Sequence, residues 1–363
     1  MSRQKKIIVS VSNDITADQR VHRVCNTLLE EGFEVILLGR KFKNSLKLNN
    51  RNYKCIRFRL LFNKGFLFYF CLNFRIFIYL LFNKSGFLLA NDLDTLPANY
   101  LAAKIKGCKL FYDSHELFTE VPELENRKFV KKFWLGIEKI CFPKIHKAYT
   151  VSESIAGYYQ KKYNINFSVV RNLPYYRKDK TEYLQRDNIL IYQGALNKDR
   201  GLELLIEAMQ YIDKHKLIIA GDGNLSNELK ILCKKLNLNS KIEFTGKLAF
   251  EDLNELTSKA LLGFSLEQNT NLNYYYSLPN KIFDYINSGT PVLCPDLPEM
   301  KKIIENYNTG TIFSGTTAKE LSEKISEVLN DNNKLIEWHN NCINASKELC
   351  WENEKEKLKS VLR

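Results

Sequence analysis

The feature that most constrains the fold is a regular alternation of short apolar segments with longer amphipathic ones along all 363 residues. The short segments are rich in β-branched and aromatic residues and end at glycine or polar residues, which predicts strands. The expected strands are Ile7–Val11, Val35–Leu38, Lys54–Phe58, Phe87–Ala90, Leu110–Tyr112, Ala148–Val151, Ser168–Val170, Asn188–Gln193, Leu217–Ala220, Lys241–Phe244, Leu262–Leu266, Pro291–Leu293 and Thr311–Phe313. Strands that alternate with helices form parallel sheets covered by helices.

The length of the chain is enough for two domains, and the alternation is interrupted once. Residues 175–187 are polar, charged and aperiodic, which indicates a linker. We therefore expect an α/β protein with two tandem Rossmann-like, doubly wound parallel-sheet domains. The first domain is expected over residues 1–174 and the second over residues 188–348, followed by an amphipathic helix within 349–363.

The cysteines and the N-terminus indicate a reducing compartment. Nine cysteines are scattered along the chain without a CxxC pair, which argues against a zinc site and against a disulfide framework. The apolar run near the N-terminus is too short for a signal peptide and is typical of a first strand. The expected location is the cytoplasm.

The net charge is uneven along the chain. Residues 1–180 hold 32 Lys and Arg against 15 Asp and Glu, a net charge of +17, whereas residues 181–363 have a net charge of −4. An excess of positive charge in one half favours an anionic partner. No helix-turn-helix, zinc-finger or RNA-binding signature accompanies this charge, so the sequence favours an anionic membrane surface over nucleic acid.

Residues 65–82 form an almost wholly apolar segment of 18 residues with Arg75 near its middle. A transmembrane helix needs ~20 apolar residues, and a central arginine is costly there. Two interpretations remain open. The segment is either an interfacial helix flanked by basic residues, which fits a peripheral protein on the inner face of the cytoplasmic membrane, or a buried helix that covers the first sheet.

The stretch LPNKIFDYINSGTPV, residues 278–292, predicts a loop, a helix of about ten residues and a buried strand. Pro279 suits the first turn of a helix. The free N–H groups at Asn280 and the helix dipole favour a phosphate, and Lys281 adds a positive charge. Asp284 lies one turn further on, where its carboxylate suits the hydroxyls of a ribose. The alternative is an ordinary amphipathic helix with a basic first turn.

This stretch resembles the donor-site helix of family 4 glycosyltransferases, which have the GT-B fold of two Rossmann-like domains facing a cleft. Many members carry two glutamates separated by seven residues. Asp284 matches the second, but Tyr276 stands at the first position, and the nearest upstream acid, Glu267, lies beyond the polar loop 268–277. The chain is closer to a bacterial subgroup with a PNKxF[DE]Y helix. The resemblance covers nearly the whole chain and implies that the helix within 349–363 crosses back to the first domain.

A second donor segment begins with Gly194, directly after an expected strand, and continues to Arg200. Ligands of such sheets bind beyond the carboxyl ends of the strands, and the planar fork of arginine suits a diphosphate. The family usually has an arginine where Ala195 stands and a lysine where Arg200 stands, so the resemblance implies that Lys281 replaces the missing cation. The alternative is a surface arginine. The GDG turn that follows the next strand, with Gly221 and Gly223, is expected to be structural.

His115 follows another buried strand and matches a family histidine that lies close to the anomeric carbon of the sugar. The resemblance implies that His115 holds either the transferred sugar or the geometry of the departing phosphate, and that it donates a hydrogen bond to a sugar hydroxyl. Asp113 and Glu116 are expected to orient His115 or the neighbouring backbone. The alternative is a satisfied structural histidine.

Three further residues are candidates for contacts with the acceptor or its phosphate: Asp14, Arg20 and Asp92. The alternative is that they cap helices or lie in solvent.

The reaction that the resemblance implies is retaining transfer of a sugar from a UDP- or GDP-linked donor to a glycan or polyprenyl-linked acceptor in bacterial surface polysaccharide synthesis. Arg200, Lys281 and the backbone at Asn280 would stabilise the charge that builds on the departing diphosphate, with His115 beside the sugar. No metal, other cofactor or protein nucleophile is expected. The alternatives are a GT-B nucleotide-sugar epimerase that uses acids near His115, or a non-catalytic, membrane-associated scaffold.

Overall fold

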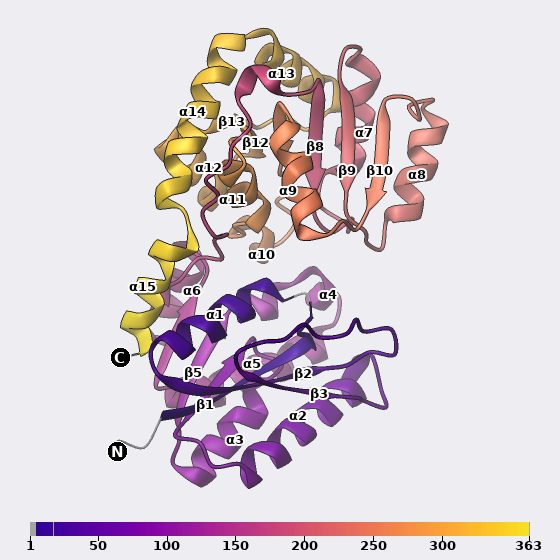
Figure 1. Cartoon of the computed structure of the whole chain (residues 1–363). Coiled ribbons are helices and arrows are strands. Elements are labelled where there is room, and N and C mark those ends of the chain that lie inside the picture. Colours follow the sequence, from indigo (N-terminus) through magenta and orange to yellow (C-terminus); the bar gives the residue numbers. More distant parts are fainter. Residues whose placement is uncertain (1–4, 17, 363) are drawn as a thin grey trace. The chain divides into compact units, whose positions relative to one another are not determined.

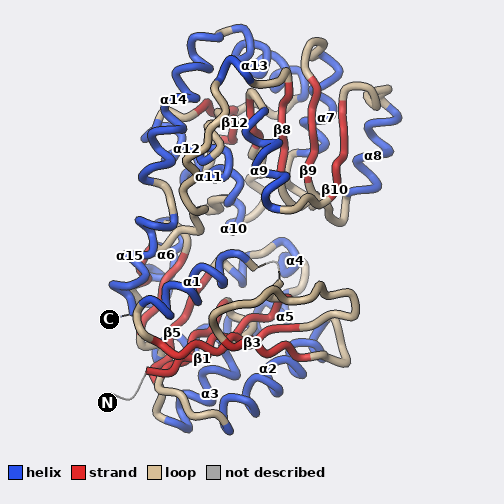
Figure 2. The backbone as a smooth tube through the Cα atoms, viewed as in Figure 1, coloured by secondary structure: helices blue, strands red, loops and turns tan. Residues whose placement is uncertain are grey.

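The computed structural model describes residues 5–16 and 18–362. The described residues form two parallel sheets, shown in Figures 1 and 2. The first sheet contains β1 (Lys5–Asp14), β2 (Phe33–Arg40), β3 (Lys54–Phe58), β4 (Phe87–Asn91), β5 (Lys109–Ser114), β6 (Lys147–Thr150) and β7 (Phe167–Val169). The second contains β8 (Ile189–Gln193), β9 (Lys216–Ala220), β10 (Ile242–Gly246), β11 (Leu262–Phe264), β12 (Val292–Pro295) and β13 (Gly310–Phe313). The predicted α/β class with two parallel sheets is confirmed.

Helices connect the strands of both sheets. In the first half they are α1 (Gln19–Glu30), α2 (Gly65–Phe82), α3 (Leu96–Lys106), α4 (Pro122–Glu125), α5 (Lys128–Cys141) and α6 (Glu153–Tyr163). In the second half they are α7 (Leu202–Ala208), α8 (Ser226–Lys235), α9 (Phe250–Lys259), α10 (Leu272–Tyr275), α11 (Asn280–Asn287), α12 (Pro298–Tyr307), α13 (Ala318–Asn330) and α14 (Asn332–Glu348), before the final helix α15 (Trp351–Leu362). Short 3₁₀ turns lie at Phe118–Glu120, Phe142–Lys144, Tyr183–Gln185 and Met209–Tyr211.

The chain divides into two compact units. The first unit contains the chain through Asn172 together with the segment from Glu354 onward, and the second contains Leu173–Asn353. The segment expected as a linker, residues 175–187, belongs to the second unit and is anchored there. Arg186 donates to the carbonyl oxygen of Ser288 at 2.7 Å and to Thr290 Oγ1 at 2.9 Å. Its side chain therefore ties this segment to the turn between α11 and β12.

Strand order explains where side chains from distant parts of the sequence meet. The first sheet has the order β3-β2-β1-β4-β5-β6-β7, and the second has the order β10-β9-β8-β11-β12-β13. In each sheet the order reverses beside the first strand, and such a switch point is where doubly wound sheets bind ligands. In the second sheet β8 pairs with β11 in parallel, with Tyr192 opposite Phe264. Residues that follow these two strands therefore emerge side by side.

Helix α2 is the apolar segment whose environment the sequence left open. In Figure 1, α2 and α3 lie on the side of the first sheet opposite α1. One stripe of α2 is buried against the unit, and its members are Phe68, Leu72, Ile76 and Leu80. Other apolar side chains of the same helix are exposed, including Phe66, Phe70 and Phe82. Burial against the sheet is therefore confirmed for one stripe of α2, whereas the other side of the helix presents an apolar face to solvent.

Candidate functional site

In the second unit, the loops that follow β8 and β9 contact each other. Gly194 follows β8 with φ +130°, and Gly221 follows β9 with φ +150°. A Cβ atom on Gly221 would lie 1.8 Å from the carbonyl oxygen of Gly194, so only glycine permits this approach. A Cβ atom on Gly223 would meet the carbonyl oxygen of Leu196 at 2.4 Å. The expected structural role of both glycines in the GDG turn is confirmed.

Helix α11 lies beside these loops and is shorter than expected. It begins at Asn280, and Pro279 is its N-cap with φ −65° and ψ 138°, so the proline lies just outside the first turn rather than within it. Tyr285 fixes the helix to two strand ends. Its hydroxyl accepts from the backbone N–H of Gln193 at 3.0 Å and donates to the carbonyl oxygen of Phe264 at 3.1 Å. The position of Lys281 is therefore set by the edge of the sheet.

Arg200 and Lys281 converge on one buried carboxylate. Arg200 Nη1 lies 3.0 Å from Glu267 Oε1, and Lys281 Nζ lies 2.9 Å from the same oxygen. The other carboxylate oxygen accepts from Ser265 Oγ at 2.6 Å. The Lys281 ammonium also lies 4.1 Å from the centroid of the Tyr192 ring, a cation–π contact. Two cations that are 81 residues apart in the sequence thus share one anion.

Charge explains why Glu267 is ionised although it is fully buried. Burial opposes ionisation and would raise the pKa, but the charges of Lys281 and Arg200 outweigh it and hold the pKa of Glu267 at about 2. Two cations against one carboxylate leave the trio with a net positive charge. The Arg200 side chain is 26% exposed, so an anion in solvent has access to this excess charge.

The remaining residues that the sequence predicts for a donor site lie around this trio. Lys281 Cε lies 3.6 Å from the Cβ position that a side chain at Gly194 would take, so Lys281 extends along the glycine loop. Asp284 lies one turn along α11, where its Oδ2 accepts from Gln193 Nε2 at 3.1 Å. Asn280 is exposed at the start of the helix. The structure therefore brings Gly194, Lys281 and Arg200 together and keeps Asp284 next to the end of β8.

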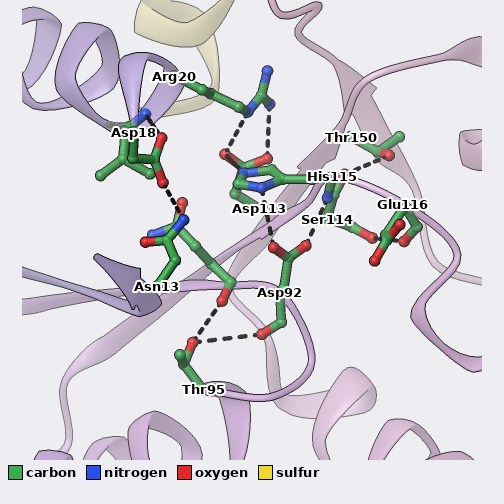
Figure 3. Close-up of polar contacts among 12 residues, drawn as sticks. Asn13, Asp18, Arg20, Asp92, Thr95, Asp113, Ser114, His115, Glu116 and Thr150 are labelled. Carbon is green, nitrogen blue, oxygen red and sulfur yellow. Dashed lines mark hydrogen bonds and ion pairs between the residues drawn. The ribbon is translucent and has the colours of Figure 1, made fainter. Parts of the chain in front are cut away.

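A second polar cluster surrounds His115 in the first unit, at the end of β5 (Figure 3). His115 Nε2 lies 2.9 Å from Asp113 Oδ2, and Nδ1 lies 3.0 Å from Asp92 Oδ2. On its other side Asp113 accepts two bonds from the fork of Arg20, at 2.8 and 3.1 Å. Arg20 also donates to the carbonyl oxygen of Val170. The cluster is a chain of alternating charges that runs from α1 through β5 to the turn after β4.

The electrostatics of this cluster revise the expected role of His115. Burial would lower the pKa of the imidazole, but Asp113 and Asp92 raise it well above its ordinary value, so the ring is doubly protonated. Burial would raise the pKa of Asp113, but Arg20 and His115 hold it at about 2. Both ring N–H groups are already paired with carboxylates. In this arrangement neither ring N–H of His115 is therefore left to donate the expected hydrogen bond to a sugar hydroxyl.

The three acceptor-side candidates have different surroundings. Arg20 is buried and paired with Asp113, so it acts through that carboxylate. Asp92 adopts a left-handed backbone with φ 58° and accepts from the backbone N–H of His115 at 2.9 Å, so it orients the histidine. Asp14 accepts from the backbone N–H of Thr16 at 3.1 Å and from Ser45, and Arg57 Nη1 lies 3.5 Å from its Oδ1, so it joins its own turn to the segment after β2 and to β3.

Sequence reasoning noticed Glu267 only as a displaced acid and did not assign it to the site. The available signal was its position directly after an expected strand. Parallel strands bring their carboxyl ends to one edge of a sheet, where the residues after β8 and β11 meet. The sequence predicted that Asp113 orients His115, whereas it predicted a contact with the acceptor for Asp92.

Comparison with known proteins identifies the type of domain. Residues 177–349 match the family model "Glycosyl transferases group 1". The chain is 26% identical over 261 residues to the chitobiosyldiphosphodolichol beta-mannosyltransferase of Candida albicans, covering 61% of this chain and 55% of that protein. It is 23% identical over 245 residues to a Campylobacter jejuni alpha-1,4-N-acetyl-D-galactosaminyltransferase named for a PP-undecaprenol acceptor, covering 63% and 62%. The chain thus spans less than two thirds of either relative.

A solved structure of sucrose-phosphate synthase from Thermosynechococcus elongatus is similar to this chain with a TM-score of 0.80 at 17% identity, covering 99% of this chain and 98% of that one. At this identity the similarity concerns the fold. Residues 177–349, which make up most of the second unit, are thus similar to the glycosyltransferase group 1 domain, and the two parallel-sheet units have the GT-B fold.

Proposed function

We propose that the protein is a retaining, metal-independent glycosyltransferase that moves a sugar from a UDP- or GDP-linked donor to a glycan or polyprenyl-linked acceptor. The observation that carries this proposal is the convergence of Arg200 and Lys281 on Glu267 beside Gly194. A cluster with excess positive charge at the switch point of a parallel sheet is suited to a diphosphate.

The proposed role of the two cations is to stabilise the leaving group. When the bond from the sugar to the diphosphate breaks, negative charge builds on the outer phosphate. Cations that are already fixed in position lower this barrier without reorganising, and removing one such group typically costs about 10²–10³ in kcat. Glu267 acts here as a positioning residue, because it holds both side chains at 2.9–3.0 Å before any substrate arrives.

Helix α11 supplies the rest of the donor site in this proposal. The N–H groups at its start, from Asn280 onward, are directed at the phosphates, since a helix N-terminus favours anions. Asp284, one turn further, binds the ribose hydroxyls. Its bond to Gln193 keeps the carboxylate at the end of β8, so ribose and diphosphate would be held by a single helix.

In the first unit, His115 enters the proposal as a fixed positive charge. Asp92 and Asp113 hold the imidazolium in place, and Arg20 holds Asp113. We propose that this charge steadies the transferred group, while the acceptor hydroxyl attacks on the face from which the diphosphate leaves. Retention then needs no covalent intermediate with the protein.

The relatives support the proposed acceptor class. The names of the two curated relatives specify acceptors carried on diphosphodolichol and on PP-undecaprenol. We propose a glycan or polyprenyl-linked acceptor at the inner face of the cytoplasmic membrane, in bacterial surface polysaccharide synthesis. The positive charge of the first 180 residues supports this location.

The experiment is release of nucleoside diphosphate from a panel of UDP- and GDP-sugars, with lipid extracts as acceptor and with EDTA present. The wild type should release one nucleoside diphosphate, and Arg200→Ala or Lys281→Ala should reduce the rate at least about 100-fold. Lys214→Ala is the matched control, because Lys214 is exposed before β9, at the opposite end of the strands. NMR of the product should show a retained anomeric configuration.

Three outcomes would contradict the proposal. Interconversion of the donor sugar without release of nucleoside diphosphate would indicate an epimerase. Turnover within threefold of the wild type in both cation variants would remove Arg200 and Lys281 from the active site. Binding of donor without any turnover of the panel would instead favour a non-catalytic scaffold.

A further inference from the structure

Helix α2 has two apolar stripes on opposite sides. Phe68, Leu72, Ile76 and Leu80 recur every four residues and are at most 7% exposed. A second series, offset by two residues, also recurs every four residues and faces outward. Its members are Phe66, Phe70, Phe74, Ile78 and Phe82, which are 67%, 58%, 55%, 38% and 82% exposed. A surface helix of a soluble protein is ordinarily polar on its outer side, and α2 is not.

The outward stripe continues onto helix α5. The rings of Phe66, Phe70 and Phe74 follow one another with centroids 6.3 Å apart, and Phe66 meets Phe133 of α5 at 6.4 Å. Phe129, one turn before Phe133, is 91% exposed. We call this continuous surface the aromatic face; it consists of the outward stripe of α2 with Phe129 and Phe133. Contiguous exposed apolar surface of this kind marks an interaction site.

The charges around the aromatic face have one sign on these two helices. The charged residue within α2 is Arg75, which is exposed. On α5, Lys128, Lys132 and Lys139 are exposed, whereas the acid of that helix, Glu138, is fully buried. The nearest exposed acids along the chain lie before α5, on α4. The surface therefore combines aromatic side chains with an excess of positive charge.

The fold decides how such a helix meets a bilayer. By length and composition α2 is apolar enough to cross a membrane, and 22% of it is buried. However, it connects β3 to β4, two strands of the same sheet, and its inner stripe is packed into the unit. To span a membrane, α2 would have to leave its position against that sheet. A helix that is apolar on both sides but fixed on one can only lie along an interface.

We propose that the aromatic face is a docking surface for an anionic lipid bilayer. Helix α2 lies in the plane of the interface with its phenylalanines among the acyl chains, and Arg75 and the lysines of α5 meet the lipid phosphates. Aromatic residues with Lys and Arg fit this environment, whereas protein interfaces are depleted in lysine. This proposal concerns a surface remote in sequence from the donor residues and needs no catalytic claim.

The test is flotation of the full-length protein with vesicles of phosphatidylcholine alone or mixed with phosphatidylglycerol. We expect the protein to float with the anionic vesicles and to be released by salt. The variant Phe66→Ser/Phe70→Ser/Phe74→Ser should lower the partition coefficient at least about tenfold, because it removes the favourable free energy of transferring three exposed rings from water into the bilayer. The charge variant Lys128→Glu/Lys132→Glu should lower binding to the anionic vesicles at least about tenfold while leaving the phenylalanines intact.

Matched controls lie on the second unit. Ile231→Ser and Phe250→Ser remove side chains that are 68% and 47% exposed, and Lys234→Glu/Lys235→Glu reverses two exposed charges on α8. These variants should float like the wild type. Thermal unfolding of every variant checks that the fold is intact. We expect Tm values close to that of the wild type, because the substituted residues are exposed. Binding of UDP or GDP should stay at the wild-type level throughout, so failure of docking and failure of the donor site are separable.

Three results would overturn the proposal. The first is a wild-type protein that floats with neither vesicle. The second is equal flotation of the wild type and the triple serine variant. The third is a dimer in sedimentation equilibrium that the triple serine variant dissociates, because the aromatic face would then be covered by a second copy of this chain.

Discussion

Substitution of Glu267 by glutamine tests the central electrostatic feature of the second unit. Glutamine keeps the size of the side chain and can still accept from Ser265, but it leaves Arg200 and Lys281 without their anion. Lys281 is only 7% exposed, so its charge gains little from water. Breaking a buried ion pair by removing one partner typically costs about 3–5 kcal/mol.

The pKa of Glu267 gives a second route to the magnitude. Its fall from the ordinary 4.5 to about 2 corresponds, at 1.36 kcal/mol per pKa unit, to roughly 3 kcal/mol of folding free energy. This contribution is fully present above pH 4.5 and is lost as the pH falls through about 2, because the depressed pKa belongs to the folded state. Glu267→Gln should therefore lower the free energy of unfolding at pH 7 by about 3 kcal/mol, or Tm by roughly 6–12 °C.

The assay is urea unfolding and calorimetry of wild type and variant at pH 7 and pH 3. Glu243→Gln is the control, since Glu243 is an exposed glutamate on the edge strand β10, and its loss should change stability by less than about 0.5 kcal/mol. If Glu267→Gln is as stable as Glu243→Gln at pH 7, the carboxylate does not hold the two cations and the reasoning is refuted.

Three other predictions concern the glycine loops and the His115 cluster. Gly221→Ala should lower the free energy of unfolding by more than about 2 kcal/mol, because the new Cβ would lie 1.8 Å from a carbonyl oxygen. The control Gly136→Ala within α5 places a Cβ with nothing within 4 Å and should be neutral or stabilising by up to ~1 kcal/mol. Urea unfolding of both variants measures the difference. The ring of His115 should still be protonated at pH 6.5 in NMR titrations, because its pKa is raised well above that ordinary value, and Asp92→Asn should lower that pKa; a wild-type midpoint near 6.5 would contradict the paired geometry. Asp113→Asn should remove an acid-sensitive stabilisation that is present above pH 3.8 and lost as the pH falls through about 2, and an unchanged acid-unfolding profile would count against it.

The fold could be predicted from the sequence because the alternation of strands and helices is a local signal. The segment Lys54–Phe58 was predicted with the observed bounds, and the strand that begins at Ile7 in the prediction begins at Lys5 in the structure. The buried stripe of α2 could not be separated from the outward one, because both are apolar and only the packing of the helix decides which is covered.

The site was predicted less completely, because its contacts join distant parts of the chain. The sequence named Arg200 and Lys281 as cations for a shared ligand, and the structure brings them to one point. The carboxylate that holds them was not assigned, since the polar loop between Glu267 and α11 hides its proximity. The pairing of His115 with Asp92 was missed for the same reason: it depends on the neighbouring positions of β4 and β5 in the sheet.

The central claim is that Arg200 and Lys281 receive a diphosphate, and comparison of nucleotide with nucleoside tests it most directly. Titration calorimetry with UDP, GDP, uridine and guanosine should show that the wild type binds one diphosphate at least about 100-fold tighter than its nucleoside. Arg200→Ala and Lys281→Ala should each weaken binding of the diphosphate by about 10–100-fold, which corresponds to the loss of one charge-assisted hydrogen bond. The affinity of both variants for the nucleoside should equal that of the wild type. Equal affinity of wild type and both variants for the diphosphate would contradict the account.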